Sequence, residues 1–203
     1  GVLNLAAGAT GMVAVFAAWQ LQDRGVLAPL AWGAGLAVAL VLALGYGRFI
    51  AARMAWREPV VKAVASLGFA LMLLGLVSFL FSDDPRKFEL PTDKAAVMIL
   101  GLRVTVTRLL LIGATVALVI GIGLLLERSR IGLQMRALAN NRRISSLIGV
   151  PILRVETMAW GLSGLLSGFT GLMFGDLVRL EPAVITFLVI PCIAAAICGR
   201  LAA

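Results

Sequence analysis

Apolar residues occur along this chain in six long runs. The runs are Val2–Leu21, Val26–Gly47, Ala63–Phe81, Leu109–Leu126, Thr157–Leu177 and Ala183–Gly199. Each has close to the roughly 20 residues that a helix needs to cross the hydrocarbon core of a bilayer. Backbone groups in lipid must be paired within the protein, and these runs lack the alternation of barrel strands, so the pattern predicts helices. We therefore expect an all-α, polytopic transmembrane bundle with about six spans.

Composition supports this class. The 203 residues are 61% hydrophobic and 14% charged, whereas a soluble domain carries charge on about a quarter of its residues. The first residue is Gly1 and already lies in an apolar run, and the sequence stops soon after the last run. We therefore expect one membrane domain over residues 1–203 that is truncated at one or both ends.

The charged residues divide between two sets of connections. Residues 48–62, residues 127–156 and Arg200 together carry eleven basic and three acidic side chains, whereas the other connections carry seven of each. Because Lys and Arg accumulate in cytoplasmic loops, the first set is predicted to face the cytoplasm. The longest connection of the second set contains VMILGLRVTVT, which fits either a short hairpin or a plain exposed loop.

Five glycines of the fifth run lie on one helix face, because their spacing alternates between three and four residues. They are Gly161, Gly164, Gly168, Gly171 and Gly175. Small residues let two helix backbones approach closely in lipid, so the stripe predicts tight helix packing, with a pathway-lining face as the alternative.

The segment GLSG at residues 161–164 resembles the surroundings of an intramembrane protease serine. The chain has no histidine to activate such a serine, so we disfavour an enzyme.

The opening GVLNLAAGATG places Asn4 and Gly8 in an apolar run. A polar side chain inside a membrane often marks a pathway, above all where glycines permit a broken helix, so these two residues are candidate pathway positions. A position of Asn4 near the membrane interface is the alternative. Pro191 is predicted to kink the last run.

The basic stretch GLQMRALANNRRISSLIGVPILR follows the fourth run. Residues 137–148 have the composition of a short amphipathic helix, and Gly149 and Pro151 are expected to end it. The helix could rest on anionic lipid headgroups or dock a cytoplasmic partner, and composition alone does not separate these alternatives.

Together with the residues that follow it, this stretch reads GLQMRALANNRRISSLIGVPILRVETMAWGLSGLLSGFTGLM, and it closely resembles the permease subunits of bacterial ABC importers for branched-chain amino acids. The opening GVLNLAAGA also resembles a motif of that family, although Ala7 replaces its customary histidine. The last residues keep only an outline of the family's small-residue helix and lack its Gly-Gly pair. Both departures leave the substrate open.

The resemblance implies that residues 127–156 form a cytoplasmic coupling loop that docks on an ATPase subunit. The implied docking residues are Arg136, Ala137, Asn140, Ser145, Ser146, Gly149 and Val150. It also implies a second permease subunit, an extracytoplasmic solute-binding protein, alternating access and a location in the bacterial inner membrane. No phosphate-binding loop of the form G-x-x-x-x-G-K-[ST] occurs, so ATP is expected on the partner, with no cofactor or metal in this chain. A scaffold subunit that recruits a cytoplasmic protein without a pathway of its own is the alternative function.

Overall fold

The computed structural model describes residues 4–81, 96–99, 102–177 and 180–198. The chain forms two compact units, one of residues 1–87 and 151–203 and the other of residues 88–150. The prediction of a single domain over residues 1–203 stays a prediction. Each unit is described by itself.

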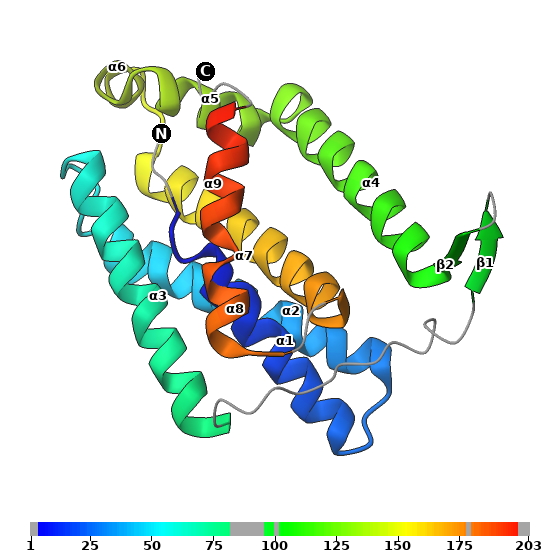
Figure 1. The fold of residues 1–203 in the computed structure, drawn as a ribbon. Helices are drawn as coiled ribbons and strands as arrows, with labels where there is room; N and C mark the ends of the chain where they lie inside the picture. Colours follow the sequence, from blue (N-terminus) through cyan, green and yellow to red (C-terminus); the bar gives the residue numbers. More distant parts are fainter. Residues whose placement is uncertain (1–3, 82–95, 100–101, 178–179, 199–203) are drawn as a thin grey trace. The chain divides into compact units, whose positions relative to one another are not determined.

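Three helices form the centre of the first unit: α1 (Ala7–Asp23), α2 (Ala28–Gly45) and α7 (Ile152–Leu177). They pack pairwise, and α1 lies against both of the others (Figure 1). The surfaces between them are made largely of small residues, among them the fully buried Ala14 and Ala39. Because lipid tails are as apolar as the helices, close backbone packing is the main attraction that such a bundle can use.

Two further elements cover α1. They are α3 (Pro59–Phe81) and α8 (Pro182–Phe187), and both contact α1 and each other. Large apolar side chains on the outer face of α3 are exposed, including Leu71 and Phe79. Such a face suits contact with lipid rather than water.

The last apolar run, in which Pro191 was predicted to cause a kink, is divided into two helices. Helix α8 ends at Phe187, and α9 (Val189–Cys198) begins after Leu188. Pro191 has no N–H to donate to the carbonyl of Phe187, four residues earlier, and its ring crowds that carbonyl. The helix therefore breaks one turn before the proline.

Helix α2 continues into a π-helix, η1 (Tyr46–Ala51), before the turns that lead to α3. Its wider turn places Tyr46 and Gly47 inside the unit and leaves Arg48 and Phe49 exposed. Single π turns occur often at functional sites.

The described part of the second unit begins with an antiparallel hairpin of β1 (Ala96–Ile99) and β2 (Leu102–Thr105), in which Ala96 pairs with Thr105. The sequence left a short hairpin and a plain exposed loop open for VMILGLRVTVT, and the hairpin is correct. It is followed by the long helix α4 (Val106–Arg128) and two short helices, α5 (Arg130–Asn140) and α6 (Arg142–Leu147). The predicted helical class is thus confirmed, with one small hairpin added.

Within the described residues, three helical stretches are long and apolar enough to cross a membrane: residues 28–51, 59–81 and 106–128. They coincide with three of the six predicted spans. The remaining three predicted spans correspond to α1 with 17 residues, to α7, and to the interrupted pair α8 and α9. A total of six spans stays a prediction.

Candidate functional site

Residues 4–6, directly before α1, are not helical, and polar groups of Asn4 and Leu5 bond to two other helices. Asn4 donates a hydrogen bond from Nδ2 to Ser163 Oγ on α7 at 2.8 Å, and its Oδ1 accepts one from the backbone N–H of Ala6 at 3.0 Å. The backbone N–H of Leu5 donates to Ser66 Oγ on α3 at 3.1 Å. Ser66 is fully buried and donates in turn to the carbonyl of Ala63 at 2.8 Å. Polar groups just before the start of α1 are thereby satisfied within an apolar bundle.

Gly8 marks the contact between α1 and α8. A Cβ on Gly8 would overlap the backbone carbonyl of Thr186, so only glycine permits this approach. Thr186 is itself buried, and its hydroxyl donates to the carbonyl of Pro182 at 2.8 Å. In this structure Gly8 is therefore a packing residue. Whether Asn4 and Gly8 line a pathway stays a prediction.

The glycine stripe of α7 lies against the two helices beside it. A Cβ on Gly161, Gly164 or Gly168 would meet α2, and one on Gly171 or Gly175 would meet α1. The tightest case is Gly171, whose Cβ would overlap the backbone of Gly11. The stripe thus lies at the meeting of α1, α2 and α7, where a side chain would push backbones apart.

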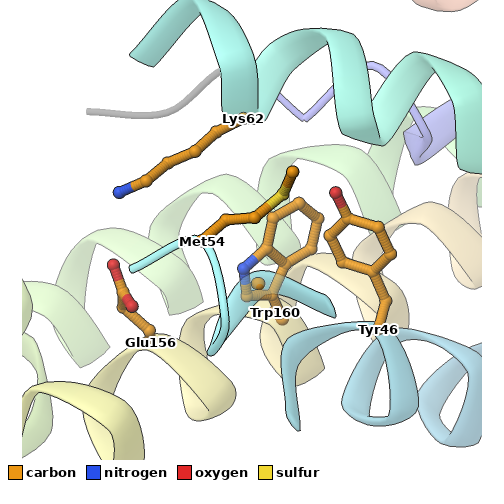
Figure 2. A pocket seen from close by; sticks show the side chains of 6 residues that line it. Tyr46, Met54, Lys62, Glu156 and Trp160 are labelled. Atoms are coloured by element: carbon orange, nitrogen blue, oxygen red, sulfur yellow. The ribbon is translucent and has the colours of Figure 1, made fainter. Parts of the chain in front are cut away.

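A small cavity lies beside η1 (Figure 2). It is lined by Tyr46, Ala51, Met54, Lys62, Glu156 and Trp160 and has a volume of about 20 Å³. A water molecule needs roughly 10–15 Å³ on this measure, whereas sites for small molecules span about 300–1,000 Å³ of pocket volume. The cavity is therefore large enough for a water but not for an amino acid.

Aromatic rings form the wall of this cavity. The Tyr46 ring lies between Trp160 and Phe69, with centroid distances of 4.5 and 4.8 Å. Gly47 packs on the side chain of Trp160, since a Cβ there would come within 2.9 Å of the Trp160 Cβ. The ammonium of Lys62 donates to the carbonyl of Ala55 at 2.8 Å and closes the turn after η1. The end of α2 is thus held against α7.

The predicted docking residues lie in the second unit, on two helices and the turn after them. Arg136, Ala137 and Asn140 are on α5, Ser145 and Ser146 are on α6, and Gly149 and Val150 follow. The prediction of one helix over residues 137–148 is wrong. Asn141 adopts an extended conformation, ends α5 and caps α6, with Oδ1 accepting from the N–H of Ile144 at 3.1 Å.

Both ends of this helix pair are fixed by specific bonds. At the start, Ser129 Oγ accepts from the N–H of Gly132 at 2.9 Å and caps α5. At the other end, Gly149 has φ +83°, a value that L side chains rarely adopt. The N–H groups of Val150 and Gly149 bond to the carbonyls of Ser145 and Ser146 at 3.1 and 3.3 Å, which is a Schellman motif. The predicted stop at Gly149 is confirmed.

The side chains of the predicted docking residues differ in what they contact. Arg136 is exposed, and its Nη2 donates to the carbonyl of Glu127 at 3.4 Å. The Ser145 hydroxyl donates to the carbonyl of Asn141 and the Ser146 hydroxyl to that of Arg143, at 2.8 and 2.7 Å. Both hydroxyls thus bond within α6. An exposed guanidinium beside a capped helix is a suitable docking element for another protein.

The structure gives three residues at these sites roles that the sequence did not indicate. Asn141 followed by a helix-forming stretch is an N-cap signal, and it could have been recognised from the residue type alone. Ser163 was considered only as a protease serine, and Ser66 was not singled out. Their bonds to residues 4 and 5 depend on the fold. Across the part of the chain that the structure describes, no three His, Cys, Asp or Glu side chains lie close enough together to bind a metal.

Comparison with known proteins gives two matches. The family model described as "Branched-chain amino acid transport system / permease component" matches residues 1–203. A protein of Methanocaldococcus jannaschii, named "Probable branched-chain amino acid transport permease protein LivH", is 30% identical over 86 residues. That match covers 42% of this chain and 27% of the relative's length. No solved structure matches the chain.

Proposed function

Because this chain belongs to the family of permease components of branched-chain amino acid transport systems, we propose that it is the membrane subunit of an ATP-driven importer for branched-chain or related small amino acids. In this proposal it pairs with a second permease subunit in the bacterial inner membrane. A solute-binding protein delivers the substrate from outside, and separate ABC ATPase subunits bind and hydrolyse ATP inside.

Family membership and helix content support a transport role. The chain is a multi-pass membrane protein, with three helical stretches long and apolar enough to span among its described residues. Family membership also makes it a transport subunit rather than an enzyme. The whole-chain family match is the observation that carries the proposal.

We place the ATPase contact on α5, α6 and the Gly149 turn. These helices carry Arg136, Arg142 and Arg143, and side-chain caps and a Schellman motif fix their geometry. A short segment can transmit movement only if it keeps its shape under load, and the caps provide that stiffness. In alternating access, the ATPase would hold this segment differently in its two nucleotide states.

We place the substrate contact near Asn4. The amide and the unwound backbone beside it are polar groups within an apolar bundle, and a zwitterionic amino acid needs such partners. The cavity at Trp160 is too small for the substrate, so the proposed pathway requires the helices to separate in another state.

The test uses the full-length protein with its partner subunits in proteoliposomes. Labelled leucine uptake and ATP hydrolysis are measured for the parent and for the double variant Arg136→Ala/Gly149→Ala. We expect the variant to lose ATPase co-purification, ATPase stimulation and uptake together. Unchanged uptake in the variant would disprove the docking role. ATPase binding by the parent without uptake of any branched-chain amino acid would favour the scaffold function instead.

A further inference from the structure

The end of η1 and the turn that joins it to α3 form a surface with exposed arginine and aromatic side chains. We name this surface the arginine–aromatic turn, and it consists of Arg48, Phe49, Ile50, Arg53, Trp56 and Arg57. The Trp56 side chain is 71% exposed and that of Phe49 is 65% exposed. The inner face of the same segment is made of Tyr46, Gly47 and Ala55, which are buried. The segment is therefore amphipathic, with a mixed cationic and apolar outer face.

The position of this turn is fixed by the helices on either side. It overlaps the last residues of a stretch that can span the membrane, residues 28–51, and it leads directly into another, residues 59–81. Only residues 52–58 separate them, so the turn lies at the membrane boundary and cannot extend far into water. Lys62 donates to the carbonyl of Ala55 and holds the turn down against α3.

The side chains of the arginine–aromatic turn indicate which kind of molecule binds there. Tryptophan prefers the level of the lipid headgroups, and arginine binds phosphate with several N–H donors. Residues 48–58 carry three arginines, Arg48, Arg53 and Arg57, and one acidic residue, Glu58, so this sequence would attract a negatively charged headgroup. A protein partner would be expected to need a surface that stands clear of the headgroups, which this short turn does not provide.

We propose that the arginine–aromatic turn is a binding site for anionic phospholipid headgroups, with Arg53 and Arg57 holding the headgroup and Trp56 inserted beside it. The site anchors the end of α2 and the start of α3 at the bilayer surface. This inference does not depend on which molecule the protein transports.

Trp56 provides a local reporter for the test. The full-length protein is reconstituted in phosphatidylcholine with increasing fractions of brominated phosphatidylglycerol, which quenches tryptophan on contact. Subtracting the fluorescence of a Trp56→Phe variant isolates Trp56 from Trp19, Trp32 and Trp160. We expect Trp56 to be quenched more strongly by brominated phosphatidylglycerol than by the same fraction of brominated phosphatidylcholine.

The variant Arg53→Gln/Arg57→Gln is then compared with Arg24→Gln, which removes an exposed arginine before the opposite end of α2. We expect the preference for the anionic lipid to fall by about fivefold for each arginine removed from the turn, and to stay at the parent value in Arg24→Gln. The proposal is overturned if the double variant keeps the parent preference. It is also overturned if neither brominated lipid quenches Trp56, a result that would indicate cover by protein instead. Because all three arginines are exposed, a thermal melt of each variant is expected to match the parent.

Discussion

Asn4 and Ser163 are 159 positions apart in the sequence, yet the Asn4 side-chain amide donates to the Ser163 hydroxyl at 2.8 Å. This bond joins the non-helical residues just before α1 to the glycine-rich helix α7. Both side chains are partly buried in an apolar bundle, where few alternative hydrogen-bond partners are at hand.

The first prediction concerns this bond. We expect Asn4→Ala and Ser163→Ala each to lower the stability of the protein in detergent, and the double variant to lose less than the sum, with a coupling energy of about 1 kcal/mol. Hydrogen bonds between membrane helices average somewhat under this value. The measurement is a double-mutant cycle on reversible unfolding.

Thr157→Ala provides the control for that cycle. Thr157 is on the same helix, but its hydroxyl donates to the carbonyl of Leu153 within α7. Its coupling with Asn4→Ala is expected to be near zero. Equal coupling for Thr157 and Ser163 would mean that the bond contributes nothing specific.

The second prediction concerns the crossing of α1 and α7. A methyl group on Gly171 would overlap the backbone of Gly11, which cannot move aside as a side chain could. We expect Gly171→Ala to destabilise the protein by about 1–3 kcal/mol, the usual cost of overpacking, as measured by thermal unfolding.

Gly68→Ala on α3 is the matched substitution. No atom lies within 4 Å of the position its Cβ would take. Because alanine is a better helix former than glycine, we expect Gly68→Ala to be neutral or slightly stabilising. If both variants melted alike, close packing at Gly171 would not be the cause.

The third prediction tests whether Gly149 matters because it ends the proposed docking segment, or only because its backbone conformation is strained for other residues. Gly149 and Gly25 both have φ +83°, and neither has an atom near its absent Cβ. Alanine should therefore cost both positions the same backbone strain, about 1–2 kcal/mol. We expect only Gly149→Ala to reduce stimulation of the ATPase, since Gly149 alone ends the proposed docking segment. Equal loss of stimulation in Gly25→Ala would show that strain, and not docking geometry, is responsible.

The fourth prediction concerns the cap of α6. Asn141→Ala removes the acceptor for the N–H of Ile144, and loss of an N-cap costs about 1 kcal/mol. A helix as short as α6 has little other stabilisation, so we expect faster hydrogen exchange at residues 144–148. The adjacent Asn140→Ala leaves the cap in place and is expected to leave exchange in α6 unchanged. Faster exchange in Asn140→Ala would contradict the assignment of the cap to Asn141.

Local patterns were sufficient for part of this architecture. Uniformly apolar runs of near-spanning length predicted helices, and Pro191 and Gly149 predicted a kink and a stop, because each acts on its own backbone. The spacing of the glycines on α7 predicted one face, which the fold places against α1 and α2.

Other features could not be read from local sequence. The composition of residues 137–148 fits one helix, and only the conformation chosen by Asn141 divides it. Likewise, nothing near Asn4 identifies Ser163 as its partner, because that pairing arises only when α7 packs beside α1. Sequence therefore indicated which positions were polar and unusual, but not which of them meet.

The break before Pro191 also has an electrostatic consequence. The carbonyl oxygen of Phe187 receives no hydrogen bond from residue 191, so its partial negative charge is available to a donor outside the helix. In a hydrocarbon environment, a carbonyl oxygen that lacks its helix partner attracts a water molecule, a hydroxyl or a positively charged amino group far more strongly than it does in water.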